Sequence, residues 1–224
     1  MLENELQFEK SLFFLLNGSD WAFLDNFFYL YSYKWTWLLF YLCFLFIFIY
    51  KKKPKEITGI LLAIFLLVLL CDQVSSGFFK PFFHRFRPAH HPDFREHVKT
   101  VFGYTGGLYG FISSHAANAF GFAIFTSLVF RNKLFTVVIF LFAALNGYSR
   151  IYLGVHFISD VIAGALVGSL IGYLIYLLYQ FVCRKCLKIE PVFSRRESYF
   201  LCGIFIIYLI FLLLFCNPNL KILF

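Results

Sequence analysis

The sequence predicts an all-α protein built as a polytopic bundle of membrane helices. Hydrophobic residues make up 61% of the 224 residues and charged residues 14%, whereas soluble domains average about 45–50% and about 25%. Phenylalanine alone supplies 34 residues, and the mean hydropathy is +0.77. A water-soluble globule of this length cannot bury so much apolar surface. The composition therefore excludes a soluble enzyme, a disordered chain and a disulfide-stabilised scaffold.

The first predicted element is an amphipathic helix over residues 1–16. Apolar residues recur there at helical spacing, with three glutamates between them. The acidic residues argue against a secretory signal peptide, which starts with basic residues. The polar run from Asn17 to Asp20 ends the helix. We therefore expect residues 1–33 to form an N-terminal segment that lies at the membrane interface.

About six spans follow in a single membrane-embedded domain. A transmembrane helix needs about 20 mainly apolar residues. The stretches that qualify are residues 34–50, 57–79, 111–130, 134–148, 157–182 and 199–216. We expect residues 57–182 to hold the functional core, with 199–216 as an additional C-terminal span.

The Lys and Arg residues between the spans predict the orientation, because cytoplasmic loops carry the excess. Eleven lie on one side and six on the other. The larger group is Lys51, Lys52, Lys53, Lys55, Arg131, Lys133, Arg184, Lys185, Lys188, Arg195 and Arg196. The smaller group is Lys80, Arg85, Arg87, Arg95, Lys99 and Arg150. We expect the first side to be cytoplasmic, and Trp21, Trp35 and Trp37 to form an aromatic belt at the outer interface.

Three polar clusters lie at outer ends of the predicted spans. They are Lys80-Pro-Phe-Phe-His-Arg-Phe-Arg87-Pro88, Ser113-Ser114-His115, and Ser149-Arg150 followed by His156 and Asp160. Because the chain alternately leaves and enters the membrane at these points, all three clusters should meet on one face.

Lys80, Arg87 and Arg150 would place three positive charges together at that face. Such cations repel one another unless a multiply charged anion lies among them, and phosphate is the obvious candidate. Ser113 and the first N–H groups of the next helix add donors where the helix dipole favours an anion. The sequence therefore predicts a phosphate-binding site.

The histidines make this site look catalytic. His156 and Asp160 are four residues apart, so the carboxylate can fix one imidazole nitrogen and leave the other free as a nucleophile or base. His115 comes from a different helix and can protonate a leaving oxygen. With cations around the phosphorus, this arrangement suits in-line phosphoryl transfer without a metal.

These residues resemble the type 2 phosphatidic acid phosphatase (PAP2) family of membrane lipid phosphatases, which shares its catalytic core with vanadium haloperoxidases. The family pattern is Lys, six residues, Arg-Pro; then Pro-Ser-Gly-His; then Ser-Arg, five residues, His, three residues, Asp. Lys80 with Arg87-Pro88 fits the first part, and Ser149-Arg150 with His156 and Asp160 fits the third. In the second part, Ile112 replaces the proline and Ser114 the glycine. The resemblance covers about residues 70–180.

The resemblance implies that His156 attacks phosphorus to form a phosphohistidine, with Asp160 orienting it. It implies that His115 protonates the leaving group and then helps to activate water. The phosphate oxygens would be held by Lys80, Arg87, Ser113, Arg150 and the backbone N–H of Ser114, and the family works without metal or cofactor. The expected enzyme is a phosphatase of a bacterial envelope lipid, such as a polyprenyl diphosphate, phosphatidylglycerophosphate or lipid A. Its site would face outward from the inner membrane.

Two alternative functions stay open. A lipid phosphotransferase would use the same residues, whereas a non-enzymatic lipid-binding or transport protein would spread charges through the depth of several spans. Asp72 is the one carboxylate deep in a predicted span, and we expect it to support one of the cations. We expect the lipid substrate and the bilayer as partners, with no nucleic acid and no obligatory protein partner.

Two groups of residues have side chains that can bind a metal ion, but neither is expected to form a metal site. The loop side chains His84, His90, His91, Asp93, Glu96 and His97 fit a polar outer loop. Cys183 and Cys186 form a lone CxxC without the two further ligands that a zinc site needs.

Overall fold

The structure, a computed structural model, describes residues 2–50, 52–189 and 193–216, with side chains from Phe8 onward, and confirms an all-α membrane bundle. Within these ranges the only β-type pairing is an isolated bridge between Phe86 and Tyr109. The α-helices are α1 (Leu2–Leu16), α2 (Ala22–Ser32), α3 (Leu38–Ile49), α4 (Pro54–Asp72), α5 (Lys80–Phe83), α6 (Ser114–Phe130), α7 (Lys133–Tyr152), α8 (Ile158–Phe181) and α9 (Arg195–Phe215). Short 3₁₀ turns are η1 (Lys34–Trp37), η3 (Pro88–His90), η4 (Arg95–His97) and η5 (Val101–Gly103), and π-helical turns η2 (Gln73–Phe79) and η6 (Val182–Leu187) extend α4 and α8.

Within the described residues, four or five helices are long and apolar enough to be spans, fewer than the six predicted, and two predicted spans have different bounds. Four helices are long and apolar enough to cross a membrane, namely Pro54–Phe83, Lys133–Tyr152, Ile158–Leu187 and Arg195–Phe215. A fifth span is formed if the pair Ala22–Ser32 and Lys34–Ile49, bent by 68°, is taken as one. The first difference is therefore that this span begins at Ala22, because α2 buries Phe27, Phe28 and Tyr31 against the bundle. The second is that α6 is shorter than predicted, because residues 111–113 precede the helix.

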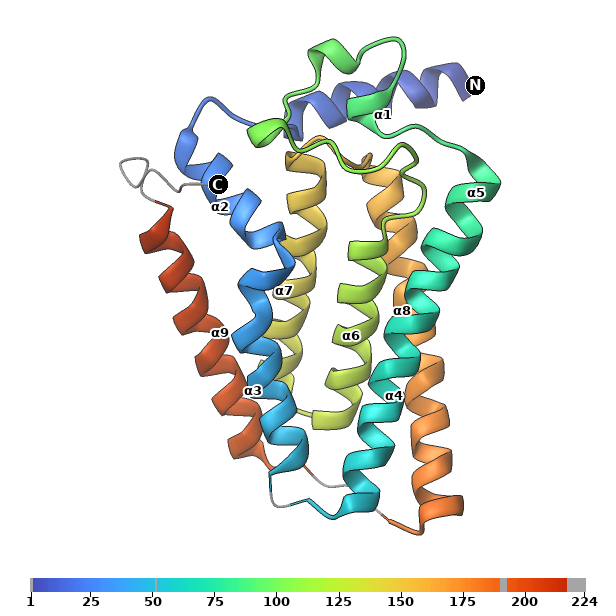
Figure 1. The fold of residues 1–224 in the computed structure, drawn as a ribbon, viewed down its shortest axis with the longest axis vertical. Coiled ribbons are helices and arrows are strands. Elements are labelled where there is room, and N and C mark those ends of the chain that lie inside the picture. The colour runs from blue at the N-terminus through green and yellow to red at the C-terminus, as the bar shows by residue number, and fades with distance from the viewer. Residues whose placement is uncertain (1, 51, 190–192, 217–224) are drawn as a thin grey trace.

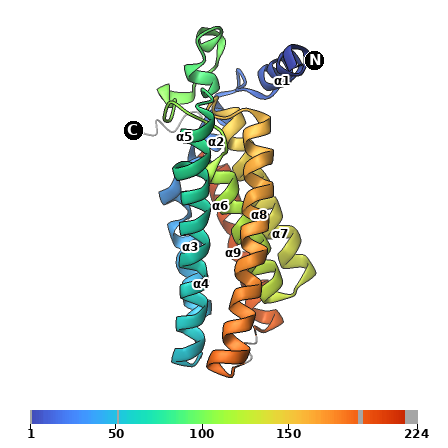
Figure 2. The ribbon, with the colours of Figure 1, turned by 90° about the vertical axis from the view of Figure 1, so that its right-hand side faces the viewer.

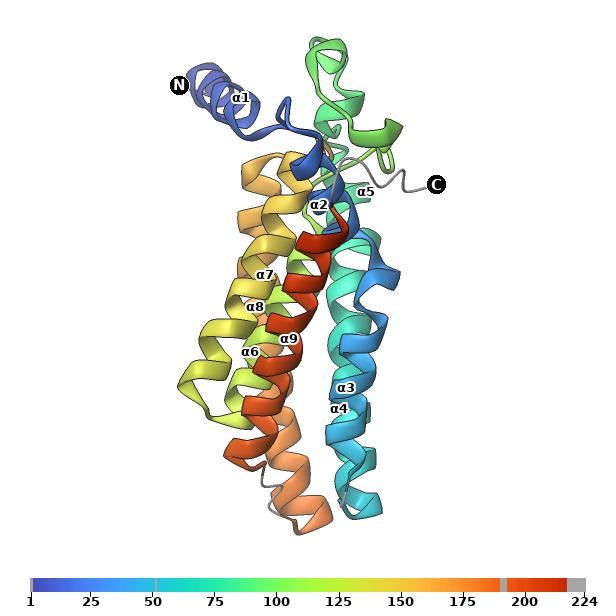
Figure 3. The ribbon, with the colours of Figure 1, turned by 90° about the vertical axis from the view of Figure 1, so that its left-hand side faces the viewer.

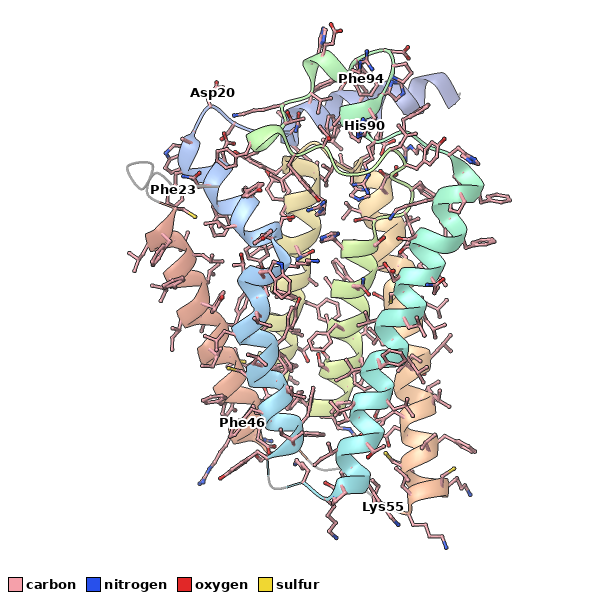
Figure 4. The ribbon with its side chains drawn as sticks, viewed as in Figure 1. Asp20, Phe23, Phe46, Lys55, His90 and Phe94 are labelled. Atoms are coloured by element: carbon pink, nitrogen blue, oxygen red, sulfur yellow. The ribbon has the colours of Figure 1, made fainter. Side chains whose placement is uncertain are left out.

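The two ends of the bundle differ in the way that the orientation argument requires. Figure 1 shows α1, α5 and the connection from α5 to α6 at one end, and the last turns of α3 and α8 with the first turns of α4 and α9 at the other. Lys55 lies at the second end, far from His90 and Phe94 (Figure 4). The side views show α1 nearly end-on, beyond the first end of the bundle and to one side of it (Figures 2 and 3). Lys51, counted with the basic loops, lies outside the described residues.

Helix α6 lies inside the bundle and contacts α4, α7 and α8. Its contact with α8 is close because Gly164, Gly168 and Gly172 of α8 face the α6 backbone. A Cβ atom at Gly168 would lie 2.1 Å from the carbonyl oxygen of Ala117, and one at Gly164 would lie 2.5 Å from that of Ser113. Side chains longer than hydrogen cannot fit there. This glycine seam sets the spacing between the start of α6 and the start of α8.

Trp37 does not join an interfacial belt, so that part of the prediction is wrong. Its side chain is 1% exposed and packs against Phe142 and Phe205, and its indole Nε1 donates a 2.6 Å hydrogen bond to the carbonyl of Tyr31. The bend between α2 and α3 turns this residue inward. Trp21 and Trp35 are 60% and 58% exposed, as an interfacial position requires.

Candidate active site

The three predicted clusters meet at the end of the bundle covered by α1. Arg87, Ser113, Arg150, His156 and Asp160 are all buried there, and Asp160 has no exposed surface. They come from the loop after α5, the N-cap of α6, the last turn of α7 and the first residues leading into α8. Charged side chains are rarely buried in this way unless they have partners, so the partners of each define the site.

The extended stretch after α5 places the side chains of Arg85 and Arg87 beside the start of α8. His84 has a positive φ of 48° and ends the helix, and Arg87 is extended because a proline follows it. Backbone bonds from Arg87 N to Leu108 O (3.1 Å) and from Gly110 N to Arg85 O (2.9 Å) fix this stretch. Side chains two apart on an extended chain point to the same side. Arg85 and Arg87 therefore both face the start of α8.

His156 and Asp160 form the predicted pair. The His156 Nδ1 atom lies 3.4 Å from Asp160 Oδ2, and the same oxygen accepts a 2.9 Å hydrogen bond from the backbone N–H of Phe157. His156 precedes the helix, and Asp160 lies in its first turn and reaches back towards it. The carboxylate is thus held by the helix start and faces one nitrogen of the imidazole.

The second nitrogen of His156 faces Arg87. The Nη1 atom of Arg87 lies 3.3 Å from Nε2 of His156, and the same guanidinium donates to the carbonyls of Tyr109 and Val155. Since a guanidinium can only donate, Nε2 must be unprotonated in this contact. The imidazole proton then lies on Nδ1, which is 3.4 Å from Asp160 Oδ2 but has no hydrogen-bond partner in the described part of the chain. This is the tautomer that a nucleophilic Nε2 requires.

Arg150 is 1% exposed, and its guanidinium is bound by side chains from α2 and from the outer loop. Its Nη1 donates to the hydroxyl of Ser32 and its Nη2 to the Tyr104 hydroxyl at 3.0 Å. Its Nε is buried without a hydrogen-bond partner. A buried guanidinium N–H without a partner is costly, and an oxygen of a bound phosphate can supply that partner.

Lys80 reaches the start of α6. Its Nζ donates to the hydroxyls of Ser114 at 2.7 Å and Ser76 at 3.0 Å. Ser113 is the N-cap of α6, where its Oγ accepts from Ala116 N at 3.4 Å, and its own N–H donates to the Asp160 carbonyl at 3.0 Å. The departure from the family glycine at Ser114 therefore supplies a hydroxyl that holds Lys80. The Ser113 hydroxyl proton stays available to a phosphate oxygen.

His115 lines a cavity beside these cations. The cavity measures about 320 Å³ and is bounded by Tyr29, Ser32, Tyr33, Lys34, Tyr104, His115 and Leu153. The imidazole of His115 therefore faces open space on the side of the cavity. Arg150, Arg87 and Lys80 are close enough to His115 to repel a positive charge on its imidazole, so His115 can carry a proton only when a bound anion offsets these cations.

Burial and the positive charges of the site shift the pKa values of its ionisable side chains. Burial, followed by Arg87, Arg150 and Lys80, holds the pKa of His156 well below its usual range. Burial and the neighbouring Arg150 lower the pKa of Arg87 to about 10, so its guanidinium stays charged at neutral pH. Burial alone would raise the pKa of the Tyr104 phenol, but the charge and hydrogen bond of Arg150 outweigh it and lower that pKa. The site is a positively charged pocket around a neutral histidine.

We expect His156 to stay neutral as the pH falls through 6.5, the ordinary histidine pKa, because its own pKa lies below that value. Removing a cation makes protonation easier, so Arg87→Gln should move the titration of His156 to higher pH. Histidine ¹⁵N NMR titration of the substrate-free protein in detergent measures both, with His156→Ala identifying the resonance. A midpoint at or above 6.5 in the unmodified protein would contradict this electrostatic picture.

Two sets of candidate residues do not join the group. Asp72 ends α4 with an exposed side chain, which forms no ion pair with a cation in the described part of the chain, so its supporting role stays a prediction. Among the described residues, no three His, Cys, Asp or Glu side chains are arranged to hold a metal ion. In the outer loop, His91 only approaches Asp93, at 3.8 Å.

Sequence reasoning missed Arg85, Tyr104 and Ser32 as parts of the site. Arg85 was counted only among the basic residues of the outer side, although its spacing of two from Arg87 in an extended stretch was a usable signal. Tyr104 and Ser32 come from segments with no catalytic pattern, and only the fold brings both to Arg150.

Comparisons with known proteins agree with this geometry. A family model described as the PAP2 superfamily matches residues 59–184. A protein of Porphyromonas gingivalis named "Lipid A 4'-phosphatase" is 54% identical over 178 residues, which cover 80% of this chain and 75% of the relative. A protein of Bacteroides thetaiotaomicron with the same name is 37% identical over 133 residues, 59% of each chain.

Two solved structures are similar. The crystal structure of Aquifex aeolicus LpxE has a TM-score of 0.54 and 35% sequence identity, and the match covers 74% of this chain and 92% of that one. The transmembrane PAP2 type phosphatidylglycerolphosphate phosphatase from Bacillus subtilis has a TM-score of 0.56, with 82% and 89% covered. At 20% identity, the second likeness concerns the fold alone.

Proposed function

The chain belongs to the PAP2 superfamily and is a lipid phosphatase, and we propose that it removes a phosphate from a lipid of the lipid A type through a phosphohistidine on His156. The observation that carries this proposal is the geometry of His156, whose Nε2 faces Arg87 while its Nδ1 faces Asp160. The alignment of catalytic nitrogen and cation is what nucleophilic attack on a phosphate needs.

The reaction proceeds in two displacements. In the first, His156 Nε2 forms a bond to phosphorus while the bond from phosphorus to the lipid oxygen breaks, and His115 gives its proton to that oxygen. In the second, a water molecule gives a proton to His115 and attacks phosphorus, which releases inorganic phosphate and free His156. Asp160 stabilises the positive charge that forms on the imidazole.

Negative charge on the phosphate oxygens is balanced by the chain itself. Lys80, Arg87 and Arg150 supply three cations, and the start of α6 supplies hydroxyl and N–H donors at Ser113 and Ser114. Fixed donors of this kind stabilise a transition state because they need no reorganisation. We propose that the enzyme therefore works without a metal ion.

The cavity beside His115 supports a lipid with a bulky polar headgroup. Its volume of about 320 Å³ corresponds to roughly ten water molecules at about 30 Å³ each, more than a phosphate group fills. Tyr29, Tyr33 and Tyr104 give its wall apolar faces with polar tips, and Lys34 adds a cation. A sugar that carries a second phosphate matches this lining. The names of the relatives point to the same class of substrate.

We propose that the site faces outward from the bacterial inner membrane. Eight basic residues lie at the end of the bundle that holds the site, because Lys10 and Lys34 join the six counted between the spans, and ten of the described basic residues lie at the opposite end. By the positive-inside rule the richer end is cytoplasmic.

Phosphate release by the full chain in detergent, with EDTA present, tests the proposal. The panel is lipid A, polyprenyl diphosphate, phosphatidylglycerophosphate and phosphatidic acid, with His156→Ala as the inactive variant and His97→Ala, an exposed loop position, as the matched control. We expect release from lipid A that survives EDTA, persists in His97→Ala and disappears in His156→Ala. Mass spectrometry of the product identifies the phosphate that left. Release that requires a metal, or that persists in His156→Ala, would overturn the mechanism, and transfer of phosphate to another lipid would identify a phosphotransferase.

A further inference from the structure

The N-terminal helix α1 contacts the catalytic machinery, although it lies outside residues 59–184 that the family model matches. It crosses the end of the bundle above the start of α8 (Figures 1 and 3). Phe13 is fully buried and packs edge-on against Phe157, with 5.4 Å between the ring centroids. The helix is thus docked on the segment that carries His156 and Asp160.

Glu9 of α1 makes two contacts at this junction. Its Oε2 accepts a 2.7 Å hydrogen bond from Nη2 of Arg85, and its Oε1 accepts a 2.9 Å hydrogen bond from the backbone N–H of Ser159. Ser159 lies in the first turn of α8, where N–H groups lack partners within the helix and the dipole favours a negative charge. The N-cap residue of α8 is Phe157, which has no side-chain acceptor. Glu9 therefore provides a cap from another helix.

Arg85 connects Glu9 to the catalytic carboxylate. Its Nη1 donates to Oδ1 of Asp160 at 2.8 Å and to Oγ of Ser159 at 2.6 Å. Its guanidinium also lies over the Phe157 ring, 4.6 Å from the centroid. The three contacts hold the guanidinium in one place between α1 and α8.

Asp160 depends on Arg85 for a partner of opposite charge. One carboxylate oxygen faces His156 and the Phe157 N–H, and the other is bound by Arg85. A carboxylate without exposed surface needs such a cation, since an unpaired buried charge is strongly unfavourable. Losing Arg85 would free the carboxylate to rotate, and with it the imidazole that it orients.

We propose that Arg85 is a positioning residue for Asp160 and that Glu9 holds Arg85 in place, so that docking of α1 sets the rate of the histidine step. This inference rests on the proposed function, in which His156 is the nucleophile. A shift of about 1 Å in a catalytic group can cost about 100-fold in rate. The relay therefore acts on kcat and leaves substrate binding unchanged, because the side chains of Glu9 and Arg85 bond to each other, to Asp160 and to Ser159, and to none of the residues proposed to bind phosphate.

A second ion pair provides a matched control. Lys99 Nζ lies 3.2 Å from Asp25 Oδ2, which ties the outer loop to α2 on the same end of the bundle. Neither Lys99 nor Asp25 bonds to Asp160 or His156. A purely structural role for the N-terminal segment predicts equal effects from breaking either pair, whereas the positioning role predicts an effect only from breaking the pair of Glu9 and Arg85.

The test compares kcat and KM of Arg85→Gln, Glu9→Gln, the double variant and Lys99→Gln in the full chain. We expect kcat to fall about 10- to 100-fold in Arg85→Gln and by a smaller factor in Glu9→Gln, with KM within about threefold. The double variant should be no slower than Arg85→Gln alone, because both changes break one chain of contacts. Lys99→Gln should stay within about twofold of the unmodified protein. Added guanidinium should restore part of the kcat of Arg85→Ala.

The outcomes separate the two proposals. If the unmodified protein releases no phosphate from any lipid, the proposed function fails. If it is active and Glu9→Gln and Arg85→Gln keep its kcat, the relay is overturned. A rise in KM at constant kcat would make Arg85 a substrate contact, which also overturns it. An equal loss in Lys99→Gln would show a structural role. Glu9→Gln and the guanidinium experiment decide the matter even where Arg85→Gln fails to fold.

Discussion

Replacing His156 with alanine is expected to lower kcat by about 10⁴-fold or more, or about 5 kcal/mol of transition-state stabilisation. In the proposed mechanism no phosphoenzyme can form without the imidazole, and the remaining cations would only bind phosphate. Direct hydrolysis by water then accounts for the residual rate. Phosphate release from lipid A under single-turnover conditions measures the loss.

A substrate with a good leaving group separates the two histidines. The nitrophenolate of p-nitrophenyl phosphate leaves without a proton, so His115→Ala should lose far less activity with it than with lipid A. His156→Ala should lose activity equally with both, because attack on phosphorus is still required. If the two variants responded alike to the change of leaving group, the assignment of acid and nucleophile would be wrong.

Arg150→Lys is expected to lower kcat/KM by about 100-fold, although the positive charge is kept. The guanidinium uses Nη1 and Nη2 to hold Ser32 and Tyr104 and leaves Nε for the phosphate. An ammonium group cannot reproduce these directions, so the substituted side chain would lose its supports along with the phosphate contact. Steady-state kinetics with lipid A measures the effect.

Arg131→Lys is the matched control for this change. Arg131 is exposed in the turn between α6 and α7, where it binds the Tyr176 hydroxyl at the far end of the bundle. The same chemical change there should leave kcat/KM within about twofold. Near-normal activity of Arg150→Lys would remove Arg150 from the list of phosphate ligands.

The fold class and the central residues followed from the sequence because both depend on local patterns. Apolar runs predict membrane helices whatever their neighbours, and the alternation of exits and entries brings Lys80, His115 and His156 to one end. The positions that sequence did not reveal depend on contacts between distant segments. Ser32 meets Arg150 only because the chain bends after α2, and Glu9 meets Arg85 only because α1 lies across the bundle.

Trp37 was predicted to lie at the membrane interface by a rule that holds for most tryptophans, but it is buried in the bundle. Tryptophan near the end of a span usually lies at the membrane interface. Here the bend of 68° between the two helices turns the indole towards α7 and α9, where it is buried. A bend of this kind leaves no periodic signal in the sequence.

A substitution in the glycine seam between α6 and α8 should affect the candidate active site differently according to its distance from the site along α8. Gly164 lies one turn from Asp160, and Gly172 lies twelve residues from it, about 18 Å along the helix. A side chain inserted at Gly172 would act as a wedge far from the chemistry and splay the inner ends of the two helices. One inserted at Gly164 would push against the Ser113 carbonyl and separate the acid from the nucleophile directly. The distance between the two candidate histidines, His115 and His156, is thus set by close backbone contacts between α6 and α8, and only the contact at Gly164 acts on it directly.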